Sequence, residues 1–379
     1  MAKILFLMRM PMDGRDNLCA KFYGQIQCAR RLGHTVHWIG WDHEGMWLCG
    51  DGEPRLLHKG RLTGLPVYHH TMLYIDLFSA LRVLAKQQKY DLVYMRYMPT
   101  FGNAPGALDL VKKNGAKLIV EHPTFPPNFA RTTSALRKPV FVYTDHVFEK
   151  IKPMVDFYAV MGDDCGGMVD GKPAVNIVNG VDVESLPLHV QPENGNEIHL
   201  LALASMSYWQ GYDRLINAVA GWQGKETFVL HMVGTEGDGS LARWMQLARD
   251  QGIEDRVIYE GALHGESLNA MVARCDLGVG GLGLHRRKIQ TAISLKLREY
   301  MARGLPFMYA VEDVSVPWPA QFCVKVSNDD NLVDLQAVRD FVLSVRCKPD
   351  IPLQMRAYAM EHMSWQEILQ EVFQKVGII

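Results

Sequence analysis

The chain has 379 residues, of which 48% are hydrophobic and 21% charged, so its composition is that of a globular protein and excludes a disordered or fibrous one. Its 40 basic and 41 acidic residues give a net charge of −1, which excludes a general nucleic-acid binder. The length predicts two or three domains with sizeable cores.

The charge is divided unevenly along the chain. Residues 1–187 carry 22 basic and 18 acidic side chains, a net +4, whereas residues 188–379 carry 18 and 23, a net −5. Within residues 82–152 there are 12 basic and 5 acidic side chains. Two interpretations stay open: a solvated basic face, or a surface that meets an anionic partner.

Cysteine usage and hydropathy indicate the compartment. The seven cysteines include no C-x-x-C pair, so neither a disulfide framework nor a zinc site is expected. The apolar run Ile4–Met8 predicts a buried strand rather than a signal peptide, and no apolar run approaches the length of a membrane-spanning helix. We therefore expect a cytoplasmic protein.

In chain order, apolar runs of strand length alternate with helical patterns. The first half contains five expected strands, at Ile4–Met8, Thr35–Ile39, Leu92–Met95, Lys117–Val120 and Phe157–Val160. It contains three expected helices, at Ala20–Leu32 (with Gly33 as its C-cap), Leu77–Gln88 and Gly106–Asn114. Short apolar strands that alternate with helices predict a parallel sheet covered on both faces.

A polar segment at Pro187–Asn196 predicts a linker, after which the alternation restarts. The expected strands are Glu197–Ala204, Thr227–Val233, Val257–Tyr259, Leu277–Val279 and Phe307–Tyr309. The expected helices are Asp213–Ala220, Ser240–Gln251, Ser267–Arg274 and Leu295–Arg303. The last segment, Leu353–Gly377, has a helical pattern with an apolar stripe of Trp365, Ile368, Leu369 and Val372.

These patterns predict an α/β protein of two doubly wound, Rossmann-like domains, residues 1–187 and 188–360, that face a cleft. The C-terminal helix, within residues 361–379, is expected to return to the first domain. Such sheets bind ligands beyond the C-terminal ends of their strands, so the cleft is the expected site.

Motifs of several familiar enzyme classes are missing. The first strand is followed by Pro11-Met12-Asp13-Gly14 instead of G-x-G-x-x-G, which disfavours a dinucleotide-binding protein. The chain also lacks the P-loop, G-x-S-x-G and H-E-x-x-H motifs.

The segment richest in chemistry is Gly280–Pro306, which follows an expected strand and leads into a helix that Gly304 would cap. Ser294 is the expected N-cap of this helix. Free backbone N–H groups at residues 294–296 would then form an anion site of the kind that diphosphates use.

Lys296 lies on the first turn of this expected helix, where a cation is unfavourable unless an anion offsets it. Glu299 follows three residues later on the same face, with a reach suited to paired sugar hydroxyls. The alternative is a surface pair between Lys296 and Glu299, worth about 0.2–0.5 kcal/mol. The basic run Arg286-Arg287-Lys288 upstream favours the anion site.

Three further segments carry turn or ligand signals. Asn179-Gly180-Val181-Asp182 predicts a turn at the domain junction, because Asn and Gly tolerate positive φ. Ser205–Ala218 predicts a strand end, a tight loop at Gly211 and a helix. Gly234–Gly237 predicts a strand-end loop that is open to a ligand.

Together these segments resemble the family-4-like glycosyltransferases of the GT-B fold, of the type found in bacterial polysaccharide and glycan biosynthesis. The resemblance spans nearly the whole chain. It rests on an ordered set of segments: Gly33-His34-Thr35-Val36, NGVD at 179–182, WQGYDRLINA at 209–218, HMVG at 231–234, VIYEGALHGESL at 257–268 and SLKLREYMARGLPF at 294–307.

The resemblance implies roles for individual residues. Glu299 corresponds to the second glutamate of the family's paired-glutamate motif, which holds the donor's ribose. His122 corresponds to a histidine that faces the donor sugar, although a histidine beside a buried strand is also a common core residue. The resemblance also implies donor contacts from backbone segments and loops. Ile293, Ser294 and Leu295 would hold the diphosphate, Leu263 would lie near the base, and Gly14 would lie in the loop over the reaction centre. Gly234 is a further implied donor-binding residue.

Three positions depart from the family pattern. Thr291 stands where the first glutamate of the motif belongs, and Ser205 and Gln210 stand where the family has an arginine and a lysine that grip the diphosphate. We therefore expect Lys296, together with Arg287, to supply the missing positive charge, because a leaving diphosphate needs stabilisation and the sequence offers no metal site.

The resemblance implies a metal-independent glycosyltransferase, without a cofactor, that moves a sugar with retention from a nucleotide-diphosphate sugar to a glycan, lipid-linked or small-molecule acceptor. Two alternatives stay open. One is a GT-B nucleotide-sugar epimerase, which needs no acceptor, and the other is a degenerate nucleotide-sugar-binding regulatory subunit.

Aromatic and basic residues of the first half would suit peripheral contact with an anionic membrane at the inner face of the cell membrane. The alternative is that the aromatic residues are core and the cations solvated. The residues concerned are Phe125, Phe129, Phe141, Tyr143, Phe148, Arg131, Arg137, Lys138, Lys150 and Lys152.

Overall fold

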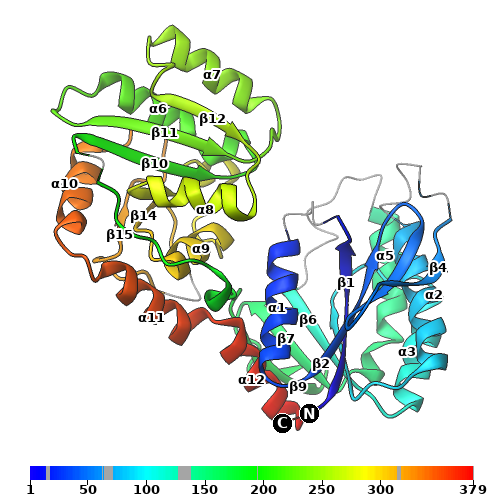
Figure 1. Ribbon diagram of the computed structural model, residues 1–379. Coiled ribbons are helices and arrows are strands. Elements are labelled where there is room, and N and C mark those ends of the chain that lie inside the picture. Colours follow the sequence, from blue (N-terminus) through cyan, green and yellow to red (C-terminus); the bar gives the residue numbers. More distant parts are fainter. Residues whose placement is uncertain are drawn as a thin grey trace. The chain divides into compact units, whose positions relative to one another are not determined.

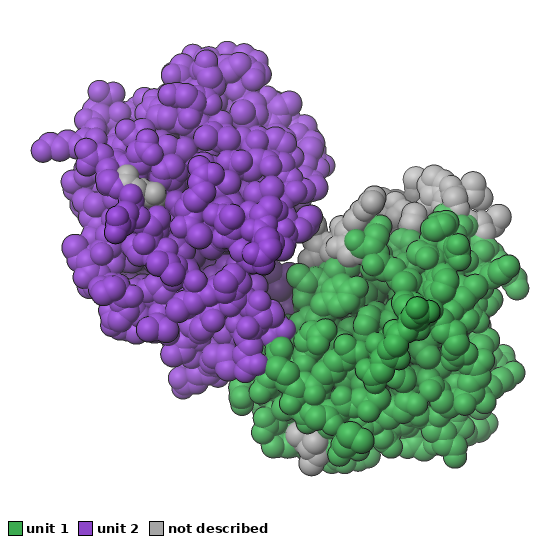
Figure 2. Space-filling view, in the orientation of Figure 1, with its two compact units in different colours: residues 1–178, 365–379 green, residues 179–364 purple. Residues whose placement is uncertain are grey.

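The computed structural model describes residues 1–13, 18–61, 63, 71–126, 138–193, 195–313 and 317–378 (Figure 1). The chain divides into two compact units, shown in different colours in Figure 2. Unit 1 comprises residues 1–178 and 365–379, and unit 2 comprises residues 179–364. These boundaries replace the expected ones, which lay after residues 187 and 360.

Unit 1 is built on a mixed sheet whose nine described strands lie in the order β4-β3-β2-β1-β5-β6-β7-β9-β8. The strands that pair in parallel are β1 (Lys3–Pro11), β2 (Thr35–Trp41), β5 (Leu92–Arg96), β6 (Lys117–Phe125), β7 (Phe157–Gly162) and β9 (Lys172–Asn176). The strands that pair antiparallel to a neighbour are β3 (Gly45–Cys49), β4 (Arg55–Lys59) and β8 (Met168–Val169). The expected parallel sheet is therefore the centre of a larger mixed one.

Alternate residues of a strand point to opposite faces of the sheet, so the apolar strands of unit 1 make both faces apolar. Helices cover both of these faces. Leu5 and Leu7 of β1 belong to one core, and Ile4 and Phe6 belong to the other. The helices of unit 1 are α1 (Cys19–Arg31), α2 (Met72–Gln87), α3 (Ala104–Lys113), α5 (Lys138–Glu149), α12 (Trp365–Val376) and the 3-10 turn η2 (Lys152–Met154).

Unit 2 is built on a parallel sheet whose six described strands lie in the order β12-β11-β10-β13-β14-β15. The strands are β10 (Glu197–Leu203), β11 (Thr227–Val233), β12 (Val257–Gly261), β13 (Leu277–Val279), β14 (Phe307–Tyr309) and β15 (Cys323–Lys325). Numbered from β10, this is the order 3-2-1-4-5-6 of doubly wound nucleotide-binding sheets, which reverses between β10 and β13. The predicted α/β, doubly wound fold class is thus confirmed.

The helices of unit 2 connect these strands. They are α6 (Tyr212–Gly221), α7 (Ser240–Asp250), α8 (Gly265–Arg274), α9 (Leu295–Arg303), α10 (Leu335–Arg346) and α11 (Ile351–Met363), with the 3-10 turns η3 (Val183–Ser185), η4 (Tyr208–Gln210) and η5 (Leu284–Arg287). No helix in the described part of the chain is long and apolar enough to cross a membrane.

The C-terminal segment forms two helices instead of the single one expected at Leu353–Gly377. Ser364 separates α11 from α12 with an extended backbone (φ −70°, ψ 127°). Helix α11 packs on α9 within unit 2, whereas α12 packs on α1 within unit 1. Trp365, Leu369 and Phe373 of α12 have no exposed surface, so the predicted apolar stripe is its buried face.

Residues 179–182 do not form the expected turn, and neither Asn179 nor Gly180 has a positive φ. Val181 instead forms an isolated parallel bridge with Ser364, and its N–H donates to the carbonyl of Met363 at 2.8 Å. The chain segments that begin and end unit 2 therefore run side by side.

Candidate functional site

The candidate site lies in unit 2 at the C-terminal ends of β10 and β13, where the strand order reverses. Two loops leave the sheet here. Residues 204–211 follow β10 and contain η4, and residues 280–294 follow β13 and contain η5. The sheet therefore brings two of the predicted ligand-binding segments to one edge.

The two loops come into close contact at two glycines, Gly211 and Gly283. Gly211 has a φ of +69°, and a Cβ added to it would lie 2.5 Å from the backbone nitrogen of Gly283. The N–H of Leu282 donates to the carbonyl of Gln210 at 2.7 Å. A side chain at Gly211 would push the loops apart, so this glycine is required by the approach of two backbones.

Gly211→Ala is therefore expected to destabilise unit 2 by about 1–3 kcal/mol, since the new Cβ meets backbone atoms and alanine disfavours a positive φ. Chemical denaturation, monitored by tryptophan fluorescence, measures the change in the free energy of unfolding. Gly221→Ala is the control, because Gly221 ends α6 and a Cβ there would have no neighbour within 4 Å. Equal losses of stability in the two variants would contradict the close approach.

Lys296, on the first turn of α9, reaches the first of these loops. Its Nζ donates to Oε1 of Gln210 at 3.0 Å and to the hydroxyl of Tyr212 at 3.1 Å. The Nε2 of Gln210 in turn donates to the carbonyl of Ser205 at 3.3 Å. The structure thus joins three predicted site residues in one chain of hydrogen bonds and adds Tyr212, which sequence reasoning missed.

Both partners of the Lys296 ammonium are neutral, and no carboxylate among the described residues lies within ion-pair distance of it. Because no negative charge among the described residues offsets its effect, burial of the amine lowers the pKa of Lys296 to about 7. An anion beside this ammonium would offset the burial and stabilise its charged form. Lys296 is therefore a cation without a carboxylate partner among the described residues.

The start of α9 is the element that the sequence predicts to bind an anion. Ser294 is the N-cap, as predicted, but its hydroxyl makes no capping hydrogen bond to the helix. Arg298 fixes this end of the helix: it donates to the carbonyl of Ser294 at 3.3 Å and forms a buried ion pair with Asp313. The first-turn N–H groups and the positive end of the helix dipole therefore lie on the same turn as Lys296.

Glu299 does not pair with Lys296, so the surface pair considered as the alternative is not formed. Its Oε1 accepts a hydrogen bond from Nε of Arg303 at 2.9 Å, and Arg303 also donates to Asn269 of α8 at 2.9 Å. The side chain of Glu299 remains 30% exposed, so its carboxylate is still accessible to a ligand.

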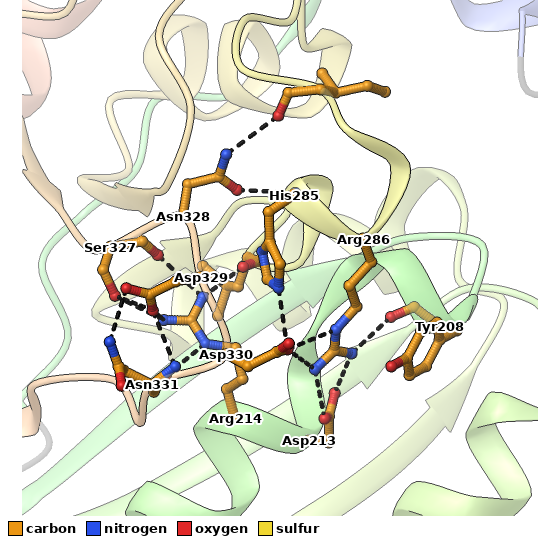
Figure 3. Close-up of polar contacts among 12 residues, drawn as sticks. Tyr208, Asp213, Arg214, His285, Arg286, Ser327, Asn328, Asp329, Asp330 and Asn331 are labelled. Carbon is orange, nitrogen blue, oxygen red and sulfur yellow. Dashed lines mark hydrogen bonds and ion pairs between the residues drawn. The ribbon is translucent and has the colours of Figure 1, made fainter.

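The basic run before α9 divides into two kinds of residue. Arg286 forms ion pairs with Asp213 and Asp330 (Figure 3), so its charge is neutralised within the protein. Arg287 is exposed and stacks on Trp209, with its guanidinium 5.5 Å from the ring centroid. Of these two arginines, only Arg287 is available as a second cation.

The remaining predicted donor-binding residues have less specific surroundings. Gly234 has a φ of +140°, and a Cβ on it would lie 1.8 Å from the carbonyl oxygen of Ala204, so loop packing already accounts for this glycine. Leu263, Ile293 and Leu295 are half-buried. Gly14 lies outside the described residues.

The exposed residue Thr291 occupies the position of the first glutamate of the family's paired-glutamate motif. Thr291 forms an isolated parallel bridge with Glu312, and the carboxylate of Glu312 binds Lys325. Among the described residues, no group of three or more His, Cys, Asp or Glu side chains is placed to hold a metal ion.

His122 belongs to the core of unit 1, contrary to the expectation that it follows a strand end. Strand β6 continues to Phe125, so His122 lies within it. His122 is 2% exposed, and the centroid of its ring lies 4.5 Å from that of Tyr97 and 5.5 Å from that of Tyr158. Burial lowers the pKa of His122 to about 4, which keeps the ring neutral. The burial is that of a core histidine, but Nδ1 of His122 has no hydrogen-bond partner among the described residues, so its role towards the donor sugar stays a prediction.

Comparison with known proteins shows what the chain is similar to. Residues 197–314, which contain the Lys296 site, match the family model described as glycosyl transferases group 1. No curated protein matches the chain. All of the chain aligns with all of HepE from Anabaena in complex with UDP (15% identity, TM-score 0.62). It likewise aligns over its full length with all of a sucrose-phosphate synthase from Thermosynechococcus elongatus (11% identity, TM-score 0.66).

A third similar structure is the catalytic domain of starch synthase IV from Arabidopsis thaliana bound to ADP and acarbose, which aligns over 98% of both chains (11% identity, TM-score 0.62). These comparisons confirm the GT-B fold and the resemblance to GT-B glycosyltransferases that the sequence predicts. They also support an enzyme of the glycosyltransferase class.

Proposed function

We propose that the protein transfers a sugar from a nucleoside-diphosphate sugar to an acceptor hydroxyl, and that unit 2 binds the donor. The observation that carries the proposal is Lys296, an ammonium with two neutral partners on the first turn of α9. A diphosphate supplies the negative charge that this arrangement lacks. HepE, which has a similar fold, forms complexes with UDP and with UDP-glucose, and this supports a nucleotide-sugar donor.

In the proposed reaction the bond between the sugar's anomeric carbon and the phosphate oxygen breaks, and the acceptor oxygen bonds to that carbon. The electron pair leaves with the nucleoside diphosphate, and the acceptor's proton passes to the departing phosphate oxygen. Lys296 and the first-turn N–H groups of α9 stabilise the charge that develops there, with Arg287 as a second cation. The proposal therefore needs no metal ion, and retention of configuration follows the resemblance.

Glu299 is proposed to bind the donor's ribose. It lies less than one helical turn after Lys296, and its carboxylate is accessible while Arg303 holds it in place. A carboxylate is acceptor-only when ionised and suits two adjacent hydroxyl donors. His122 has no role in this proposal, because its ring is enclosed by aromatic side chains.

For the acceptor we propose a glycan or a lipid-linked molecule at a membrane surface, bound by unit 1. The support is α5, whose first turns expose Val140, Val142 and Tyr143. Phe148 is buried in the core and Lys152 pairs with neighbouring acidic residues, so neither contributes. Three residues of the expected patch lie outside the described part of the chain: Phe129, Arg131 and Arg137.

Sedimentation with phosphatidylglycerol vesicles tests the membrane proposal. The full chain is expected to sediment with these vesicles at low salt, and Val142→Asp is expected to weaken the binding because it places a charge on the exposed apolar turn. If the unmodified chain stays in the supernatant, the membrane proposal is wrong.

The donor proposal is tested by thermal unfolding with a panel of UDP-, GDP-, ADP- and dTDP-sugars. A ligand at 100 times its dissociation constant stabilises the folded protein by about 2.7 kcal/mol, which is a clear shift. No shift with any of them would contradict the donor site. Binding without transfer or hydrolysis would identify a regulatory subunit, and isomerisation of the nucleotide sugar alone would identify an epimerase.

A further inference from the structure

Arg286 has no hydrogen-bonding capacity left for a ligand. Its Nη1 donates to Asp213 at 2.8 Å and to the carbonyl of Tyr208 at 2.9 Å, and its Nη2 donates to Asp213 at 2.7 Å and to Asp330 at 2.8 Å. Its Nε donates to Asp330 at 3.0 Å. These bonds use all five N–H donors of the guanidinium. Although Arg286 belongs to the basic run, its role is therefore internal.

These contacts hold both ends of one short segment of the chain. Figure 3 shows the guanidinium between Asp330 and Tyr208, with Asp213 also bonded to it. The guanidinium also stacks on the ring of Tyr208 at 4.3 Å from its centroid. Tyr208 and Asp213 are the two ends of segment 208–213, which carries Gln210 and Tyr212 between them.

The middle of this segment holds the candidate ligand-binding cation. The Oε1 of Gln210 and the hydroxyl of Tyr212 are the two acceptors of the Lys296 ammonium. A bidentate arginine–carboxylate pair fixes orientation as well as distance, which a lysine does not. Both acceptors therefore lie between two residues that Arg286 binds.

We propose that Arg286 and Asp213 are positioning residues of the donor site: their ion pair fixes segment 208–213 and thereby holds Gln210 and Tyr212 against the ammonium of Lys296. For its effect on the donor this inference rests on the proposed function. The geometry around Lys296, however, is a property of the ligand-free protein and can be measured without any donor.

The charged groups around Lys296 make its titration a suitable probe. Tyr212 of α6 faces the amine with a hydroxyl that burial keeps neutral. Asp213 of α6 is engaged by Arg286, and Glu299 of α9 by Arg303. Burial alone lowers the pKa of the amine, so loss of the enclosing segment would raise it toward the value of an exposed lysine.

The test uses Arg286→Lys, which keeps the positive charge but loses the bidentate pair, and Asp213→Asn. Arg339→Lys is the matched control, because Arg339 of α10 makes a similar bidentate pair with Glu226 in the same unit, at 2.7 and 2.8 Å. The first readout is the titration midpoint of Lys296 in the ligand-free protein, by 13C NMR of reductively methylated lysines, assigned with Lys296→Arg. The second is the dissociation constant of UDP by calorimetry.

In Arg286→Lys and Asp213→Asn the midpoint is expected to rise by about one pH unit or more and the dissociation constant of UDP to rise about tenfold. In Arg339→Lys neither is expected to change. Because lysine at position 286 keeps the charge, the rise in Arg286→Lys would report lost enclosure of the amine and not lost repulsion. If Arg286→Lys does not fold, Asp213→Asn decides.

Unchanged midpoints and unchanged UDP affinity in the folded variants would overturn the inference, and so would weaker UDP binding with an unchanged midpoint, which would mean that Arg286 contacts the nucleotide. A raised midpoint in a protein that binds no nucleoside diphosphate would support the positioning role and refute the proposed donor. The two failures are therefore distinguishable.

Discussion

Lys296→Met is expected to lower kcat/KM for sugar transfer by about 100-fold, because one positive group that acts on the leaving diphosphate is worth a factor of this size in an enclosed site. The site offers few substitutes, since Arg286 is neutralised by Asp213 and Asp330. Transfer from a labelled nucleotide sugar that binds in the thermal-unfolding panel measures the change.

The control for this prediction is Lys225→Met, which removes an exposed lysine from the bend before β11 and is expected to leave the rate unchanged. Arg303 is unsuitable as a control because it binds both Glu299 and Asn269. Lys296→Met is also expected to keep or raise the melting temperature, since methionine fills the space without burying a charge. Equal effects on the rate in both lysine variants would show that Lys296 has no special role.

Donor affinity is expected to fall about tenfold for each pH unit above 7 and to level off below it, because the pKa of the free amine is about 7 and the diphosphate binds its charged form. Above this pH the protein must take up a proton to bind the donor. Calorimetry in two buffers of different ionisation enthalpy measures that uptake, which approaches one proton per site at about pH 8 and disappears near pH 6.

The lowered pKa of Lys296 also makes the free energy of unfolding depend on pH. The pKa of Lys296 is lowered in the folded chain and has its ordinary value near 10.5 in the unfolded chain, so between these values the unfolded state binds more protons. The contribution of Lys296 to the free energy of unfolding therefore rises with pH across this window. Binding without proton uptake at pH 8 would contradict both statements, and Lys296→Met should lack the pH dependence of binding.

Much of the fold was predictable because its central strands are continuous apolar runs that alternate with helical patterns. The edge strands β4, β8 and β15 were not predicted; β4, for example, is half-exposed and mixes charged with apolar residues. Helix α10 was missed although its signal is present: its buried residues Leu335, Val338, Val342 and Val345 follow helical spacing.

The candidate site was predictable as far as local sequence determines it. The N-cap at Ser294 and the unfavourable cation at Lys296 are properties of one segment. The approach of Gly211 to Gly283 brings distant loops together, and only that approach reveals Tyr212 as a partner of Lys296. Likewise, the basic run alone does not show that remote carboxylates neutralise Arg286 and leave Arg287 exposed.

His122 was placed after the end of a strand because the strand was predicted to end at Val120, whereas β6 continues to Phe125. In the full strand β6, Glu121 and His122 point to opposite faces of the sheet. Glu121 is the residue with charged partners: the buried Lys21 and the partly exposed Arg96 each lie 3.0 Å from its carboxylate. Their charges lower the pKa of Glu121 to about 2 despite the burial that raises it.

The division of the chain also has a consequence for biosynthesis. Unit 2 is a single contiguous stretch, so all of its residues are available to fold as soon as residue 364 has left the ribosome. Unit 1 begins first and finishes last, because the face of its sheet that α1 covers also requires Trp365 and the rest of α12. Until α12 has been made, the part of unit 1 in residues 1–178 therefore leaves the apolar surface that α12 covers exposed, throughout the synthesis of unit 2. The unit whose synthesis starts first is thus the last to be completed.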